Sequence, residues 1–197
     1  RLPYFADDHV ITQAYLWASE NGAGVQARAP AQATFDNVLA NAPKSTLAFV
    51  VPTEGYSATE CLVRWCWCDA LFMAPPAFAE LSKQTGDPRY RDFATAEFWA
   101  TTDFLYDPVE HLYYRDSRFF DRRDEQGRKQ FWSRGNGWVF AGMARMIPLL
   151  PEGSADRRRM ETLFKEMAAK LVTLQKEDGY WAPSLLAPEG SPPESSG

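Results

Sequence analysis

Cysteine and histidine are scarce in this sequence: three cysteines and two histidines occur among 197 residues. The cysteines, Cys61, Cys66 and Cys68, lie within eight residues of one another, which gives no disulfide framework of the kind found in small secreted domains. We therefore expect them to be buried free thiols. His9 and His111 are not spaced as metal ligands, and the sequence predicts no metal site.

Further absences exclude several classes of function. The net charge is −5 and no basic tract stands apart from acidic residues, so the chain has no electrostatic footprint for nucleic acid. No run reaches the ~18 apolar residues that a membrane-spanning helix needs. The sequence also lacks Gly-x-Ser-x-Gly, the Walker phosphate loop and His-Glu-x-x-His, which leaves no support for a serine hydrolase, an NTPase or a zinc protease.

The residues that are present describe a helical globular protein. Apolar residues make up 45% and aromatic residues 14% of the chain, enough for a sizeable core and for platforms that hold ring-shaped ligands. Apolar spacing, caps and prolines predict about six helices and very little strand. The helices cover residues 7–20, 31–40, 68–84 with a break at Pro75-Pro76, 88–104, 136–150 and 154–178. Without a repeat of fixed period, this pattern favours a helical toroid with long loops gathered at one end.

Two acidic segments are candidates for chemistry. Asp69 is flanked on both sides by aromatic and apolar residues, and if it faces a cavity, burial would raise its pKa and suit it to general acid catalysis. The alternative is that Asp69 only caps the helix that begins at Ala70. Asp7 and Asp8 have the same alternative, because the helix dipole favours carboxylates at a helix N-terminus.

The run Arg134-Gly135-Asn136-Gly137-Trp138 is a candidate for ligand binding. Its two glycines do not follow a strand and lack the third glycine of a dinucleotide-binding motif, so we reject that interpretation. A turn that leads into the next helix would instead hold Arg134 towards an anion such as a carboxylate, with tryptophans stacking on a sugar. A purely structural entry into the helix is the alternative.

Taken together, these segments resemble the unsaturated rhamnogalacturonyl hydrolases, family 105 of the glycoside hydrolases, which are related to the unsaturated glucuronyl hydrolases of family 88. The resemblance is carried by Trp-Cys-Asp-Ala-Leu-Phe-Met-Ala-Pro-Pro at residues 67–76 and by Arg-Gly-Asn-Gly-Trp at residues 134–138. Asp7-Asp8, residues 35–40 and residues 116–119 support it in the same order, so it covers almost the whole chain.

The resemblance implies an all-α (α/α)6 toroid of the six-hairpin type. It implies an enzyme that removes 4,5-unsaturated uronic acid from the non-reducing end of oligosaccharides left by polysaccharide lyases, with no metal or organic cofactor. One Asp protonates the C4=C5 double bond, water adds at C5, and the hemiketal opens, unlike in glycosidases that use two carboxylates. By resemblance, Asp69 is the proton donor and Asp7 the second catalytic Asp, with Asp8 as its close alternative. The residues expected to bind substrate are Asp8, Trp67, Met73, Arg134, Gly135, Asn136, Gly137 and Trp138, and Gly135 to Gly137 would form the turn between Arg134 and Trp138.

Two positions depart from the family's pattern. Tyr113, Tyr114 and Arg115 stand where part of the family places a His, and Thr12 stands where a glycine is common; both departures concern the exact substrate rather than the family. The segment Tyr113-Tyr114-Arg115-Asp116-Ser117-Arg118 is a further candidate for chemistry, and an Arg–Asp ion pair at the surface is its plain interpretation. A non-catalytic carbohydrate-binding toroid is the alternative function. A sugar epimerase ranks behind it, because it needs catalytic histidines.

The length sets a further expectation. Twelve helices of about 11–12 residues with their loops need on the order of 300 residues, and about six helices are predicted here. We therefore expect residues 1–197 to form a single toroid domain that is incomplete at both ends.

No signal peptide is visible, and Arg1 is not an initiator Met, so a cytoplasmic and a periplasmic location in a bacterium are both compatible with the sequence.

Overall fold

The secondary structure is almost entirely helical, as predicted. The computed structural model describes residues 4–41, 43, 45–49, 61 and 64–190. Its helices are α1 (Ala6–Ala18), α2 (Ala29–Ala40), α3 (Ala70–Met73), α4 (Pro75–Thr85), α5 (Pro88–Leu105), α6 (Ser133–Met146) and α7 (Ala155–Leu174), with shorter helical turns η1 (Ser19–Ala23), η2 (Val25–Arg28), η4 (Ser117–Phe119) and η5 (Ile147–Leu149). Two short strands, β1 (Tyr106–Asp107) and β2 (Leu112–Tyr113), pair antiparallel. Among the described residues, no helix is long and apolar enough to cross a membrane.

The helix boundaries follow from local signals in the sequence. The predicted break falls at Pro75, which ends α3 and occupies the first turn of α4, because proline has no N–H to donate within a helix. Gly86 ends α4 with a left-handed φ of 74°, which a residue without Cβ adopts readily. Asp87 then accepts the Arg89 N–H at 3.0 Å and caps α5. Ser154 caps α7 in the same way.

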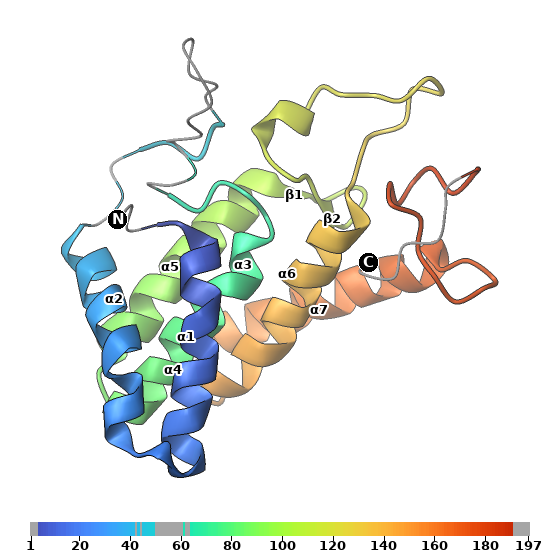
Figure 1. Cartoon of the computed structure of the whole chain (residues 1–197). Coiled ribbons are helices and arrows are strands. Elements are labelled where there is room, and N and C mark those ends of the chain that lie inside the picture. Colours follow the sequence, from blue (N-terminus) through green and yellow to red (C-terminus); the bar gives the residue numbers. More distant parts are fainter. Residues whose placement is uncertain (1–3, 42, 44, 50–60, 62–63, 191–197) are drawn as a thin grey trace.

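The chain reverses repeatedly, so that several helix N-termini lie at one end of the molecule (Figure 1). The N-terminal ends of α1, α3 and α6 point towards the upper part of this view, and the start of α6 lies beside the β-hairpin. Helix α1 packs against α2, α3 and α4, and α6 packs against α3, α4 and α7. This gathering of helix starts and loops is the end of the molecule at which the sequence predicts a site.

The main core is built from aromatic rings between α1, α2 and α4. Phe35 and Phe78 stack with ring centroids 3.8 Å apart. The His9 ring is buried and meets Phe35, Trp65 and Phe78 edge-on, with centroids 5.8, 6.1 and 6.3 Å away. Edge-to-face contacts of this kind add stability beyond the area that they bury. They fix the first turns of α1 on the rest of the fold.

The expectation of three free thiols is wrong for two of the cysteines. Cys61 and Cys66 form a disulfide, with Cα atoms 4.9 Å apart, a separation that suits the bond. Both are buried in a small apolar cluster with Leu47. Cys68 is free and buried as expected. The spacing of the cysteines alone does not reveal this proximity.

Candidate active site

Asp69 precedes α3 but does not cap it. The residue has helical backbone angles, φ −64° and ψ −22°, and its side chain makes no capping hydrogen bond within the described part of the chain. The carboxyl group is half-buried, and burial is the main cause that raises its pKa above the ordinary value. The apolar flanks of Asp69 predicted this direction. A carboxyl group that holds its proton towards neutral pH is able to act as a general acid.

Three charged side chains act on Asp69 from other elements. The negative charge of Asp7 adds to the rise in the Asp69 pKa. The positive charges of Arg115 and Arg134 oppose it, together with the backbone N–H of Asp69 itself. Residues 7, 115 and 134 come from three distant parts of the chain, so the fold assembles one acid, one second carboxylate and two guanidinium groups.

Helix α1 is fixed in the position that brings Asp7 to Asp69. The Gln13 side chain donates to the carbonyl oxygens of Phe72 at 2.8 Å and of Met73 at 3.1 Å, at the end of α3. Asp7 and Asp8 are both exposed in the first turn of α1. Of the two, Asp7 is the residue whose charge acts on Asp69. This favours Asp7 over Asp8 for the predicted role of second catalytic Asp.

Helix α6 begins earlier than predicted, and this corrects the expected turn between Arg134 and Trp138. The helix begins at Ser133, so Gly135, Asn136 and Gly137 are helical residues. A Cβ atom on Gly135 would lie 2.5 Å from the Trp132 ring and 2.9 Å from the Cys68 sulfur. Gly135 is therefore needed for close packing rather than for a turn.

Asn136 has a different role from the predicted contact with substrate. The side chain is fully buried, its Oδ1 accepts the Tyr113 N–H at 2.7 Å, and its Nδ2 donates to the Tyr113 carbonyl at 3.0 Å. The segment after β2 is held from its other side as well, because the Cys68 N–H donates to the Arg115 carbonyl at 3.0 Å. Asn136 thus positions β2, the strand that leads to Arg115.

A cavity of about 630 Å³, a size that suits a sugar, lies beside the two guanidinium groups. The Cζ atoms of Arg134 and Arg115 lie 4.8 and 5.8 Å from the Trp132 ring centroid. The residues that line the cavity are Arg115, Phe119, Asp124, Gln130, Phe131, Trp132, Arg134, Pro183, Ser184 and Ala187. Sequence reasoning placed Arg115 in a candidate segment but did not name it among the site residues, since an Arg–Asp surface pair was the plain interpretation.

The predicted contact residues Trp67, Met73 and Trp138 pack against apolar side chains. The Trp138 ring packs on Phe72, with centroids 4.6 Å apart. Trp67 packs on Phe49 with centroids 6.0 Å apart, and Met73 packs against the main core. All three predicted residues are half-buried, so each combines a supporting contact with some exposed surface.

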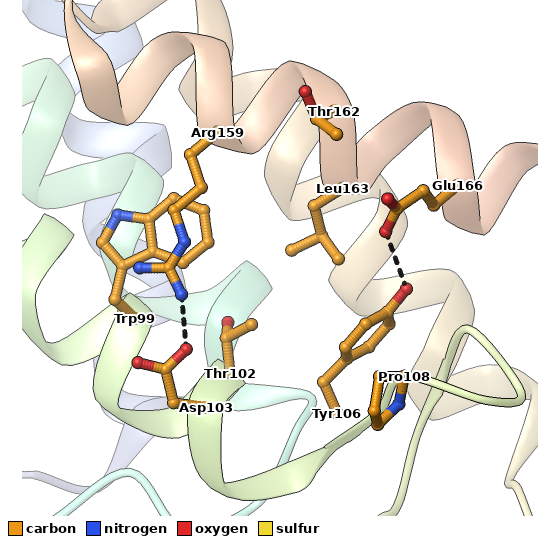
Figure 2. Close-up of a pocket in the computed structure, with 9 residues that line it drawn as sticks. All are labelled: Trp99, Thr102, Asp103, Tyr106, Pro108, Arg159, Thr162, Leu163 and Glu166. Carbon is orange, nitrogen blue, oxygen red and sulfur yellow. Dashed lines mark hydrogen bonds and ion pairs between the residues drawn. The ribbon is translucent and has the colours of Figure 1, made fainter.

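A second cavity, of about 540 Å³, lies between α5 and α7 (Figure 2). Its charged groups bind one another across the gap: Arg159 donates to Asp103 and stacks on Trp99, with Cζ 3.8 Å from the ring centroid. The Tyr106 hydroxyl donates to Glu166 at 3.2 Å. These contacts bridge the two helices, and none of the predicted site residues lines this cavity.

The histidines do not form a catalytic pair. His9 is enclosed by aromatic rings in the core, whereas His111 lies in the β1–β2 turn, with Nδ1 2.9 Å from the Tyr106 hydroxyl. This arrangement gives no support to the epimerase hypothesis. Within the described residues, no group of three or more His, Cys, Asp or Glu side chains is placed to hold a metal ion.

Comparison with known proteins finds similar hydrolases in other organisms. The sequence is 44% identical to an unsaturated 3S-rhamnoglycuronyl hydrolase of Alteromonas sp. (strain LOR), over 99% of this chain and 48% of that protein. It is 43% identical to an enzyme of the same name from Formosa agariphila, over 68% of this chain and 37% of that protein. The chain thus spans less than half the length of these curated relatives.

The fold agrees with a solved structure of a glycosyl hydrolase family 88 protein from Bacteroides vulgatus. The two structures superpose with a TM-score of 0.80 and 28% sequence identity, over 98% of this chain and 51% of the other. The sequence pattern of Glycosyl Hydrolase Family 88 matches residues 1–197. The resemblance carried by the motifs around Asp69 and Arg134 is therefore confirmed, and the chain belongs to glycosyl hydrolase family 88.

Proposed function

We propose that this chain forms the catalytic part of a hydrolase that releases 4,5-unsaturated uronic acid from the non-reducing end of lyase-generated oligosaccharides. The observation that carries the proposal is Asp69, a half-buried carboxyl group with a raised pKa that does not cap its helix. The names of the relatives, unsaturated 3S-rhamnoglycuronyl hydrolases, support a substrate in which the unsaturated uronyl residue is joined to rhamnose.

In the proposed mechanism, Asp69 donates its proton to C4 of the C4=C5 double bond. The positive charge that develops at C5 is shared with the ring oxygen, and water adds at C5. The carboxylate left on Asp69 accepts a proton from that water, so that the acid is restored. The resulting hemiketal opens and releases the remaining sugar, with the consumption of one water molecule overall.

The surrounding charges suit this sequence of steps. Asp7 favours the protonated form of Asp69 before the reaction, because two carboxylates in one site resist carrying charge together. Arg134 is placed to attract the uronate carboxylate, as a guanidinium does most effectively. The half-buried rings of Trp67 and Trp138 would meet the apolar face of the sugar.

We also propose that residues 1–197 belong to one toroid domain, and that the other helices of the toroid lie outside this sequence. The superposition on 51% of the Bacteroides vulgatus protein supports this proposal. The full protein is therefore the proper material for assays of activity.

The activity is tested by following the ultraviolet absorbance of the conjugated double bond in unsaturated uronyl-rhamnose disaccharides. We expect the full protein to remove this absorbance, and Asp69→Asn to lower kcat by 10²–10⁴-fold with substrate affinity retained. Asp103→Asn is the matched control, because it changes an exposed carboxyl group in the α5–α7 cavity. It should keep the wild-type rate. Wild-type turnover by Asp69→Asn would remove the assigned proton donor. Tight binding of the disaccharide without any turnover would favour a non-catalytic carbohydrate-binding protein.

A further inference from the structure

Residues 45–49 form a short segment that is anchored beside the candidate active site by contacts with distant parts of the chain. Arg64 donates to the Ser45 carbonyl at 3.1 Å. Leu47 is buried in the small apolar cluster that also contains the disulfide. The position of the next described residues in this segment is therefore set by tertiary contacts and not by local helix or strand structure.

Phe49 connects this segment to a predicted substrate-binding residue. The Trp67 ring centroid lies 6.0 Å from that of Phe49, with an angle of 44° between the two planes. The Arg118 Cζ atom lies 3.5 Å from the Phe49 ring centroid, a cation–π distance. The Phe49 N–H donates to the Ser117 hydroxyl at 2.8 Å. Both the backbone and the ring of Phe49 are thus held.

The guanidinium group that contacts Phe49 is itself fixed in orientation. Arg118 donates through Nε and Nη2 to the two oxygens of the Asp116 carboxylate, at 2.8 Å each, and Asp116 is fully buried. A two-point pair of this kind fixes the plane of the guanidinium group. A continuous set of contacts therefore runs from the buried Asp116 through Arg118 and Phe49 to Trp67.

The same part of the chain also holds the backbone next to Asp69. The Cys68 N–H donates to the Arg115 carbonyl at 3.0 Å, so residues 115–118 fix residue 68 by its main chain and Trp67 by way of Phe49. Trp67 is half-buried and stands two positions before Asp69. An indole ring stacks on a partner only when its plane is correctly oriented, so the orientation of Trp67 matters for binding a sugar at this site.

We infer that Phe49 is a positioning residue, which holds the Trp67 ring in the orientation that stacks on the sugar of the unsaturated uronyl substrate. This inference rests on the proposed function, because Trp67 has its role there. Phe49 carries no charge, so its removal leaves the charges around Asp69 in place. The loss of Phe49 should therefore weaken substrate binding and leave proton transfer from Asp69 intact.

The test measures kcat and KM of the full protein with an unsaturated uronyl-rhamnose disaccharide over a range of pH. Phe49→Ala is expected to raise KM by about three- to tenfold, the effect of one lost aromatic contact. The kcat value and the alkaline limb of the pH–rate profile should be retained. Phe49→Tyr should have a KM close to that of the wild type, because it keeps the ring.

A double-mutant cycle separates action through Trp67 from other effects of the change. If Phe49 acts through Trp67, Phe49→Ala has nothing left to disturb in a protein that already carries Trp67→Ala. The double variant should then have the same KM as Trp67→Ala alone. A further three- to tenfold rise in KM in the double variant (about the full effect of the single change) would overturn the inference.

Phe140→Ala is the matched control, because Phe140 is also a half-buried phenylalanine in a ring contact, 4.2 Å from Phe164 between centroids. It should keep the KM of the wild type. Urea unfolding is measured for each variant, and Phe49→Leu, which keeps apolar volume without a ring, takes the place of Phe49→Ala if that variant does not fold.

The outcomes distinguish the inference from the proposed function. A wild-type KM in the folded Phe49 variant that lacks the ring would overturn the inference and leave the proposed function standing. A shift of the alkaline limb in that variant would also overturn it, since Phe49 would then act on Asp69. The absence of turnover by the wild-type protein on any unsaturated uronyl disaccharide would contradict the proposed function itself.

Discussion

The side chain of Asn136 binds the backbone of Tyr113 through both of its polar groups. Oδ1 accepts the Tyr113 N–H at 2.7 Å, and Nδ2 donates to the Tyr113 carbonyl at 3.0 Å. Nδ2 also donates to the carbonyl of Trp132 at 3.0 Å. One buried amide therefore joins the start of α6, which carries Arg134, to the segment that carries Arg115.

Asn136→Ala is expected to lower the free energy of unfolding by about 2–4 kcal/mol, because it leaves the buried N–H and carbonyl of Tyr113 without partners. Asn136→Asp keeps the acceptor but turns a carboxylate towards two carbonyl oxygens, so it should be at least as destabilising. Urea unfolding of the three proteins measures the difference. Stability equal to that of the wild type in both variants would contradict this role.

The sequence predicted the fold better than the roles of individual site residues. The break at Pro75 and the end of α4 at Gly86 follow from backbone chemistry that acts within a few residues. The start of α6 depends on contacts with distant segments, among them the Ser133 N–H that donates to the Pro183 carbonyl at 2.9 Å. The Cys61–Cys66 disulfide joins residues only five positions apart, but the spacing alone did not predict it. Sequence reasoning also predicted that Asn136 contacts substrate. No local pattern shows that the partner of its side chain is the backbone of a residue 23 positions away.

We expect that Gly135 cannot be replaced by a larger residue without a loss of stability. A Cβ atom would lie 2.5 Å from a carbon of the Trp132 ring and 2.9 Å from the sulfur of Cys68, so Gly135→Ala must displace the ring on which Arg134 rests. We expect a loss of about 1–3 kcal/mol in unfolding free energy and a several-fold fall in kcat/KM. Gly142→Ala is the comparison variant. Its Cβ atom would lie 2.5 Å from the Leu71 backbone carbonyl oxygen, so it would also crowd a neighbour, but not the Trp132 ring. A Gly135→Ala protein with wild-type stability would show that the ring moves freely.

Asp107 anchors the β-hairpin to the loop before α6. Burial alone would raise its pKa, but donors from Lys129, Glu110, Tyr114 and Val109 outweigh burial and lower the pKa from 3.8 to about 2. The shortest of these contacts is the 2.6 Å ion pair with Lys129. The ionised form is thus favoured in the folded protein by about 2 kcal/mol.

This stabilisation is present above the unfolded pKa near 4 and is lost as the pH falls towards 2. Asp107→Asn should therefore be less stable than the wild type at pH 7 by about 2 kcal/mol, and the difference should shrink as the pH falls from 4 to 2. Thermal unfolding at a series of pH values gives the comparison. A difference that stays constant down to pH 2 would show that the charge of Asp107 is not responsible.

The charges around Asp69 should set the pH range of the reaction. In the proposed mechanism activity requires the protonated carboxyl group, so it should fall as the pH rises through the Asp69 pKa. Asp7 raises that pKa by its negative charge, whereas Arg134 lowers it by its positive charge. Removing one charge or the other should move the alkaline limb of the pH–rate profile in opposite directions.

Asp7→Asn is expected to move the alkaline limb of kcat/KM to lower pH, and Arg134→Gln to higher pH, whatever each change does to the maximal rate. The direction separates an electrostatic action on Asp69 from simple damage to the site, because misfolding or lost contacts lower the rate without a systematic shift of the limb. Asp103→Asn, which removes an exposed carboxylate paired with Arg159 on α7, should leave the limb in place. Shifts of the limb in the same direction for both site variants would mean that the titrating group is not Asp69.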